Sequence, residues 1–394
     1  MAALLSVDDA QRRLFGLMPP VAREQAALHD AAGRWTATPL AAMRTQPDRA
    51  LSAMDGYAIR FADLPGPWTV VGESAAGRPL SQVIGDREAA RIFTGAALPD
   101  GADTILVQED GVRDGAQLRL SGDGPGRVGA HVRMAGLDFR TGDPLIDAGM
   151  RLTPARVALA AAAGHARLPV RRRLRVAIVA TGDELRPAGS PLAPGQLPES
   201  NGTMLAALLA DLPVDTIDLG ILPDRLDALT SAFRAVDADL LITTGGASVG
   251  DHDLVRPALK AAGADIDFWR VAIRPGKPMM AGRMRDVIVV GLPGNPVSAF
   301  VTAHVFARPL VAHLCGAADP LPRLARAPLA DALAANGPRA DYMRAVHGPG
   351  GVGPAALQDS SMLRTLAAAD CLIVRPPHAP AAAAGEMVDI LPLA

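Results

Sequence analysis

The stretch DLLITTGGASVGDHD, residues 239–253, decides the fold class. An apolar strand-like run, 239–244, leads through two glycines toward a helix, and similar units occur on both sides of it. Further strands are expected at 174–180, 214–222, 268–273 and 286–292, with helices near 201–212, 224–236, 253–262 and from Pro296 onward. This alternation predicts a mostly parallel α/β sheet with helices on both faces.

The sequence on either side of this α/β region has a different pattern of apolar and turn residues. Short apolar runs separated by Gly, Pro and Asp fill residues from about 50 to 150 and the final 70 or so, which predicts a β-rich insertion and a small C-terminal β domain. Helical spacing marks 6–32, although Pro19 and Pro20 interrupt it, and an alanine-rich helix is expected within 151–169. The expected fold class is therefore α/β plus β, in several domains.

Composition excludes several classes of function. The 394 residues carry 41 acidic and 39 basic side chains, so no overall basic field is available for nucleic acid. Two cysteines, Cys315 and Cys371, cannot build a disulfide framework, which fits a reducing compartment. The N-terminus lacks a signal-peptide core, and 287–314 is too interrupted for a membrane span. We expect a cytoplasmic protein that binds neither nucleic acid nor membrane.

Polar residues follow the expected strands where a doubly wound sheet binds its ligand. Thr181, Asp183 and Glu184 follow the first strand and Asp224 the second. The third strand is followed by a loop with close-approach glycines, a hydroxyl and two acids: Gly245, Gly246, Ser248, Asp251 and Asp253. Together they suggest a Mg²⁺-assisted phosphate site, since Mg²⁺ is usually held by one or two carboxylates and ligand phosphates. Individually, these acids could be helix caps and the glycines turn residues.

Two further turns extend this prediction. RPGKP places Arg274 and Lys277 beside the expected rim, where they could hold an oxyanion or form a basic surface turn. LPGNPVSAF stiffens a strand-to-helix turn and puts Ser298 in the first helical turn. In the β-rich part, SAMDGYAI contains Asp55 and RIFTGAALPDGAD contains Thr94, and neither matches a general phosphate or metal motif. Taken by itself, Asp55 fits a turn acid better than a catalyst.

Seven segments in order, SAMDGYA, TGAALPDGADTILVQED, TGDEL, ESNGTML, TTGGASVGDHD, RPGKP and LPGNPVS, resemble the molybdopterin molybdenumtransferase family, which includes MoeA and the C-terminal part of gephyrin. The resemblance implies a homodimer of four-domain subunits. It implies an elongated linking and dimerisation domain at 1–50 with 138–172, a β-rich inserted domain at 51–137, a molybdopterin-binding α/β domain at 173–320 and a C-terminal β-barrel-like domain at 321–394.

The implied reaction inserts molybdenum from molybdate into adenylated molybdopterin and releases AMP, with Mg²⁺ assisting and with transient contact to the molybdopterin adenylyltransferase. Family acids fall on Asp55, Asp138, Glu184 and Asp253 as catalytic residues, with Asp224 and Asp253 at the metal. Substrate-binding positions fall on Ser248, Arg274, Lys277, Ser298, Arg344, Ser360 and Ser361, besides Thr94, Thr181, Asp183, Gly245 and Gly246 at the rim and in the inserted domain.

Two departures from the family pattern and two other functions stay open. Arg274 stands where such proteins often have lysine, and ESN at 199–201 replaces a more usual DSN. The alternative functions are an ATP-dependent molybdopterin adenylyltransferase, which the TTGGASVGDHD loop alone would suit, and a non-catalytic dimeric assembly scaffold.

Overall fold

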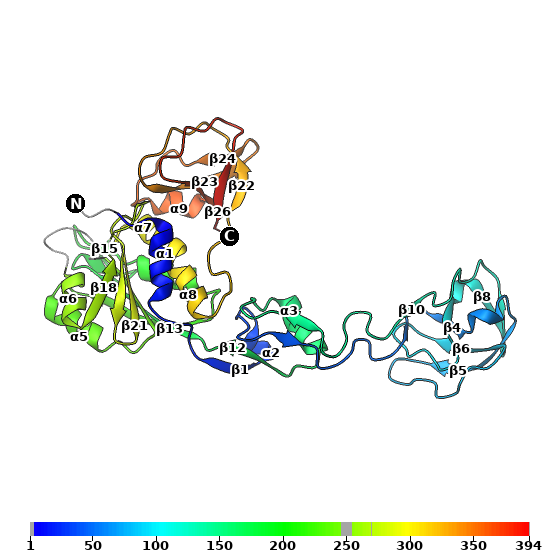
Figure 1. Ribbon diagram of the computed structural model, residues 1–394. Helices are drawn as coiled ribbons and strands as arrows, with labels where there is room; N and C mark the ends of the chain where they lie inside the picture. Colours follow the sequence, from blue (N-terminus) through cyan, green and yellow to red (C-terminus); the bar gives the residue numbers. More distant parts are fainter. Residues whose placement is uncertain (1–3, 246–253, 269, 394) are drawn as a thin grey trace. The chain divides into compact units, whose positions relative to one another are not determined.

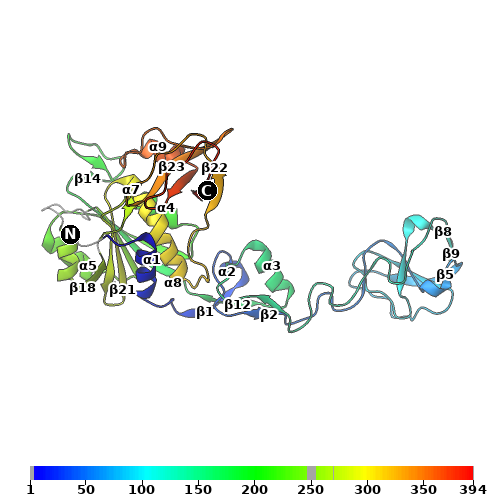
Figure 2. The same ribbon diagram turned by 45° about the horizontal axis from the view of Figure 1, so that its top comes forward.

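The computed structural model describes residues 4–245, 254–268 and 270–393. The chain divides into two compact units, the first made of 1–38, 148–152 and 169–394 and the second of 39–147 with 153–168. Each is described by itself (Figures 1 and 2). The predicted four-domain boundaries stay a prediction.

A six-stranded mixed sheet forms the centre of the first unit. Its order is β16-β13-β17-β21-β20-β18. The strands span Val214–Leu222 (β16), Leu174–Thr181 (β13), Leu240–Thr244 (β17), Val287–Leu292 (β21), Met280–Met284 (β20) and Ala264–Phe268 (β18). β16, β13, β17 and β21 pair in parallel, whereas β20 is antiparallel to both β21 and β18. The expected α/β sheet is present, and its parallel strands place their carboxyl ends along one edge.

Alternating side chains of these strands build two separate cores, one on each face of the sheet. Val176, Ile178 and Ile242 point into one core. Ala177, Val179 and Leu241 point into the other. The first core is closed by α1 (Val7–Gly16), α4 (Asn201–Leu209), α7 (Pro296–Thr302), η3 (Ala303–Ala307) and α8 (Arg308–Leu314), and the second by α5 (Leu226–Arg234) and α6 (Val255–Ala261). Helices therefore cover both faces, as the buried apolar runs predict (Figure 1).

The expected strand at 268–273 is wrong. β18 ends at Phe268, and the next strand, β19 (Ile273–Arg274), pairs with β23 (Ala340–Gly348) of a different sheet. Leu5 bridges Val271, and the Ala272 N–H donates to the Leu5 carbonyl at 2.7 Å, so Val271 and Ala272 pair with the N-terminal segment. The RPGKP turn therefore starts at the C-terminal sheet rather than at an end of the central one.

The expected helix over 6–32 is also shorter than predicted. α1 ends at Gly16, and Pro19 and Pro20, which cannot continue a helix, precede strand β1 (Arg23–Ala27) and a short helix α2 (Leu28–Ala31). β1 pairs with β12 (Arg167–Arg171).

The C-terminal segment forms its own sheet in the first unit. Its order is β19-β23-β25-β26-β22, with β24 pairing with β23. The remaining elements are β22 (Ala325–Pro328), β24 (Gly351–Pro354), α9 (Leu363–Ala368), β25 (Cys371–Arg375) and β26 (Met387–Pro392). Leu366, Leu372 and Leu391 join the core under α7 and α8, so this sheet packs on the α/β domain.

One helical run, Pro296–Leu314, is long and apolar enough to span a bilayer, with a mean hydropathy of 1.3 over the relevant window. Within this unit, however, 83% of that window is buried. The run is α7, η3 and α8 together, and its side chains supply much of the larger core, which accounts for its apolar composition.

The second unit is built on an all-β core. Its main sheet has the order β7-β4-β6-β5-β9-β8. These strands are β4 (Gly56–Ile59), β5 (Trp68–Ser74), β6 (Glu88–Ile92), β7 (Thr104–Val107), β8 (Gly111–Asp114) and β9 (Gln117–Leu120), with η1 (Phe61–Asp63) and η2 (Gln108–Asp110) between them. Smaller pairs join β10 (Val132–Arg133) to β3 (Leu51–Ser52) and β11 (Pro144–Ile146) to β2 (Leu40–Ala41), and helix α3 (Pro154–Ala162) completes the unit.

Candidate functional site

The carboxyl ends of the central strands open onto a pocket of about 790 Å³. Its wall combines the ends of β13 and β17, the start of α4, the turn before α7 and the segment before α9. The lining residues include Thr181, Glu184, Asn201, Asp224, Gly245 and Ser361. The pocket thus lies beyond the carboxyl ends of the strands, where doubly wound sheets bind their ligands.

Gly245 is required by the backbone at the end of β17. Its φ is +92°, and a Cβ there would lie 2.4 Å from the carbonyl oxygen of Thr181. The Thr181 hydroxyl is buried and has no hydrogen-bond partner among the described residues. A buried hydroxyl without a partner is uncommon, and at the wall of a pocket it is suited to a bound ligand or water.

Asn201, within the ESNGTML segment, lines the pocket, although the sequence pattern did not predict it as a site residue. Its amide nitrogen donates to the Thr244 hydroxyl at 2.9 Å and to the Gly294 carbonyl at 2.7 Å. These bonds tie the start of α4 to the end of β17 and to the turn before α7. They also leave the amide oxygen buried without a donor in the described part of the chain.

Three predicted acids meet at the ends of β13 and β16. The Asp224 backbone N–H donates to Asp183 Oδ1 at 3.1 Å. Desolvation raises the pKa of Asp224, and the charges of Asp183 and Glu184 raise it further. No basic side chain of the described residues pairs with these three carboxylates. An acidic corner whose negative charge is not compensated is suited to a hard cation.

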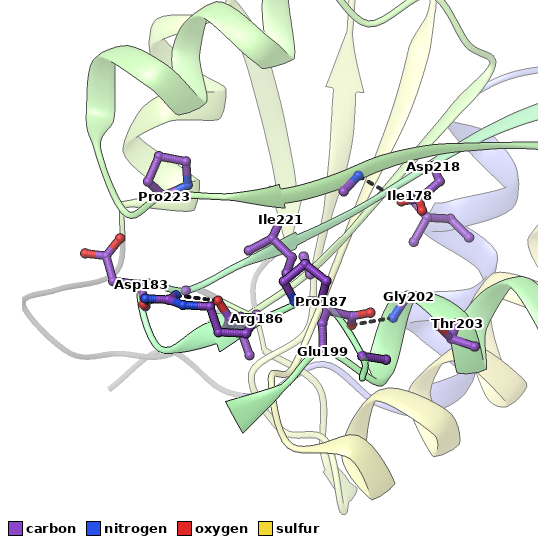
Figure 3. Close-up of a pocket in the computed structure, with 15 residues that line it drawn as sticks. Ile178, Asp183, Arg186, Pro187, Glu199, Gly202, Thr203, Asp218, Ile221 and Pro223 are labelled. Atoms are coloured by element: carbon purple, nitrogen blue, oxygen red, sulfur yellow. Dashed lines mark hydrogen bonds between the residues drawn. The ribbon is translucent and has the colours of Figure 1, made fainter. Parts of the chain in front are cut away.

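A second hollow of about 860 Å³ shares Ala180, Gly182, Leu185 and Glu199 with this pocket. Figure 3 shows Asp183 and Arg186 at one end and Thr203 with Asp218 at the other. The Arg186 guanidinium donates from one nitrogen to the carbonyls of Asp183 and Leu185, at 2.9 and 2.6 Å. Arg186 was not predicted as a site residue, although it directly follows the TGDEL segment.

Ser360 and Ser361, two of the three predicted residues of the C-terminal region, lie in the segment before α9, and Ser361 lines the pocket. Ser360 accepts from the Asn295 amide at 3.1 Å, and its carbonyl accepts from Val297 N–H at 3.1 Å. Ser361 lines the pocket and donates its hydroxyl to Asp359 at 2.6 Å. These contacts connect the segment before α9 to the turn before α7.

Arg344 lies behind the rim rather than on it. It is 1% exposed, and its guanidinium donates to Gln358 Oε1 and to the carbonyls of Leu357 and Met362. Burial lowers its pKa. In this structure Arg344 holds the loop that carries Ser360 and Ser361.

The two cations of the RPGKP turn, Arg274 and Lys277, have different surroundings. Arg274 forms an ion pair with the buried carboxylate of Asp341 on β23, and this hydrogen bond raises the Arg274 pKa. Lys277 is exposed and has no ion pair among the described residues. Ser298 is buried inside α7, and its carbonyl accepts from the Thr302 hydroxyl at 2.6 Å. Of these two cations, Lys277 therefore has the side chain that is more available to bind an anion.

The predicted residues of the second unit fall into one pair and one single residue. Asp55 Oδ1 accepts from the Thr94 N–H at 2.7 Å and from its hydroxyl at 2.9 Å, and these bonds, the backbone one first, lower the Asp55 pKa. Asp138 is exposed, and its N–H donates to the Gln46 carbonyl at 3.0 Å. Gly246, Ser248, Asp251 and Asp253 lie outside the described residues.

The fold, together with the residues at the carboxyl ends of the central strands, defines a multidomain α/β protein with a pocket suited to a charged small molecule. Three family descriptions match it: "MoeA N-terminal region (domain I and II)" over 5–164, "Probable molybdopterin binding domain" over 177–313 and "MoeA C-terminal region (domain IV)" over 326–393. The chain belongs to the molybdopterin molybdenumtransferase family, as the motifs indicated.

Individual relatives support this membership. The chain is 38% identical over 324 residues to a molybdopterin molybdenumtransferase of Haemophilus influenzae, covering 79% of this chain and 78% of that protein. It is 38% identical over 361 residues to molybdopterin molybdenumtransferase 2 of Mycobacterium tuberculosis, covering 86% and 87%. A solved MoeA protein of Pyrococcus horikoshii matches with a TM-score of 0.82, 26% identity and 99% coverage of both chains.

Proposed function

We propose that this chain transfers molybdenum from molybdate into adenylated molybdopterin and releases AMP. The observation that carries the proposal is the pocket of about 790 Å³ at the carboxyl ends of the central strands. The chain that forms it is 38% identical to named molybdenumtransferases over most of its length. Among the described residues, Asp183, Glu184 and Asp224 cluster without a paired cation, and the buried Thr181 hydroxyl has no hydrogen-bond partner. Such a site positions anionic reactants through a metal and fixed dipoles.

The acidic corner fits Mg²⁺, since Asp224 carries a raised pKa that a bound cation would relieve. Asp224 would hold the ion, with Asp183 orienting the Asp224 backbone and Glu184 beside it, and the predicted ligand Asp253 lies outside the described residues. Bound there, Mg²⁺ would offset charge on the breaking phosphoanhydride. Two carboxylates and substrate phosphates are the usual ligands of this ion.

The remaining residues position the two anions. Lys277 is proposed as a point charge for the oxyanion, and Ser361 and the Thr181 hydroxyl as hydrogen-bonding groups of the pocket. Arg274 keeps its proposed role with fewer free donors, because Asp341 takes part of its fork. Ser298 and Arg344 are proposed to act through the helix and loop that they support.

Asp55 is proposed as a catalytic carboxylate, and Asp138 as a second acid of the same unit. The Thr94 bonds favour the ionised form of Asp55, and this carboxylate would orient a water molecule during anhydride hydrolysis. We further propose a homodimer, as the family resemblance implies, cytoplasmic location and transient contact with the adenylyltransferase that supplies the substrate.

The discriminating experiment incubates the purified chain with adenylated molybdopterin and Mg²⁺, with and without molybdate, and measures AMP. A parallel reaction supplies ATP and free molybdopterin and measures pyrophosphate. We expect AMP release that molybdate stimulates, and no pyrophosphate. Pyrophosphate formation would indicate an adenylyltransferase instead. Absence of both products from a folded chain would indicate a non-catalytic scaffold.

A further inference from the structure

The Asp55 side chain and its backbone are held by different partners. Thr94 donates two hydrogen bonds to the side chain, both to Oδ1, and the described residues place no donor on Oδ2. The Asp55 carbonyl accepts from the Gln108 N–H at 3.1 Å. One carboxylate oxygen is therefore fixed while the other stays available to a reacting group.

Arg91 connects the chain segments that flank Asp55. It lies on β6 directly opposite Tyr57 of β4. One guanidinium nitrogen donates to the Gly56 carbonyl at 3.0 Å, and the other donates to Gln108 Oε1 at 2.8 Å. Gly56 follows Asp55 in sequence, and the Gln108 backbone N–H donates to the Asp55 carbonyl, so Arg91 contacts both the residue after the acid and the residue that binds its carbonyl.

Two aromatic rings keep this guanidinium in place. Its central carbon lies 5.2 Å from the ring centre of Tyr57 and 4.8 Å from that of Phe93. Phe93 directly precedes Thr94, so Arg91 also contacts the segment that binds the Asp55 side chain. Only a planar fork can donate in two directions while it packs on two rings, and a lysine cannot make all these contacts.

The backbone at Gly56 leaves little freedom to compensate for a lost contact. A Cβ at Gly56 would lie 2.1 Å from the Leu106 carbonyl oxygen, so β4 and β7 approach closely next to Asp55. Arg91 contacts the three elements that surround Asp55, because it lies on β6, donates to Gly56 of β4 and donates to Gln108 of η2.

We propose that Arg91 is the positioning residue of Asp55, acting through the Gly56 carbonyl and the Gln108 side chain. The inference rests on the proposed function, in which Asp55 is a catalytic carboxylate. Arg91 also adds a positive charge that supports ionised Asp55, after the larger effect of the Thr94 hydrogen bonds.

The test compares Arg91→Ala and Arg91→Lys with Arg119→Ala, an exposed arginine on β9 of the same sheet. For each full-length variant we would measure thermal unfolding, kcat and KM for molybdate-dependent AMP release, and the Asp55 pKa by carbon-detected NMR titration. The titration requires no turnover, so it tests the positioning even if the wild-type chain releases no AMP.

We expect Arg91→Ala to lower kcat by about 10- to 100-fold with little change in KM, and to raise the Asp55 pKa. Arg91→Lys should restore the pKa toward the wild-type value but recover kcat only in part. Arg119→Ala should match the wild type. An unchanged Asp55 pKa in folded Arg91→Ala, or a loss of kcat that Arg91→Lys reverses completely, would overturn the proposal. Failure of the wild-type chain to release AMP would instead count against the proposed function alone.

Discussion

The backbone N–H of Asp224 donates to Asp183 Oδ1 at 3.1 Å, and this bond holds two acids together at the ends of adjacent parallel strands. The arrangement costs folding free energy, because burial and the charges of Asp183 and Glu184 raise the pKa of Asp224. Functional sites commonly retain such strain, since a ligand that neutralises the charge relieves it.

Substituting Asp224 with asparagine should therefore stabilise the fold and impair the reaction. A raised carboxyl pKa in the folded state means that ionisation at neutral pH opposes folding, so removal of the charge should raise the free energy of unfolding at pH 7. Mg²⁺-dependent AMP release should fall. Asp227→Asn is the control with the opposite sign, because the hydrogen bond from Arg225 lowers the Asp227 pKa. Denaturant unfolding of both variants tests this, and destabilisation by Asp224→Asn would contradict it.

At the opposite end of the sheet, Asp239 should be a structural acid. It accepts two bonds from the Arg172 guanidinium, at 2.6 and 2.7 Å, and one from the Arg175 N–H at 2.8 Å. Burial alone would raise its pKa, but these bonds outweigh burial and lower it. Asp239→Asn should lower the unfolding free energy by about 2–3 kcal/mol, because it leaves Arg172 without its charged partner.

The neighbouring pair between Asp237 and Arg175 supplies the control. Its two bonds are both 2.9 Å long, but the Asp237 side chain is 86% exposed. Asp237→Asn should have little effect, as expected for a solvent-screened pair. Equal losses of stability in urea unfolding of the two variants would show that burial does not decide the contribution of Asp239.

Gly245→Ala should destabilise the chain more than an alanine at an unobstructed glycine. Both the positive φ and the 2.4 Å approach to the Thr181 carbonyl oppose a Cβ at Gly245. At Gly115 φ is +57° but nothing lies within 4 Å of the added atom, so Gly115→Ala reports the backbone cost alone, about 1 kcal/mol. A smaller effect at Gly245 than at Gly115, measured by thermal unfolding, would show that the close approach imposes no cost.

Acid should destabilise the first unit through His304. Burial, together with the charge of Arg308, lowers the pKa of His304 from 6.5 to about 4. The unfolded state then binds more protons between these values, so the stability contributed by neutral His304 is complete above about pH 6.5 and is lost as the pH falls toward 4. The total loss should be on the order of 3 kcal/mol.

The pH dependence of urea unfolding checks this prediction. His304→Gln should flatten the curve between pH 4 and 6.5, whereas His29→Gln, at a side chain that is 83% exposed, should leave it unchanged. A His304→Gln curve as steep as that of the wild type would assign the acid sensitivity to other groups.

The sequence predicted the parallel strands of the central sheet well and its antiparallel edge poorly. LRVAIVA, DLLITT and DVIVVGL are long apolar runs because both faces of these strands are covered. β18, with the sequence ADIDF, is half exposed and resembles a loop. Within FWRVAI, Val271 pairs with the N-terminal segment and Ile273 with the C-terminal sheet, which accounts for their burial. An apolar run in the sequence indicates that a segment is buried, but it does not indicate which sheet the segment joins.

The sequence likewise predicted some residues of the candidate site and not others. Asp183, Glu184 and Asp224 were predicted because each follows a strand, and strand ends share one edge. Asn201 was not assigned, because its partners lie 43 and 93 residues away and no spacing encodes those contacts. Likewise, the sequence could not show that Arg344 would be buried or that Arg274 would be paired with Asp341.

The most direct test of the central claim is the ratio of molybdenum incorporated into the pterin product to AMP released in the same reaction. We expect one molybdenum atom per AMP in the wild-type chain, with both products lost together in Asp55→Asn. AMP release that proceeds without molybdenum in the product, or at the same rate without molybdate, would contradict it.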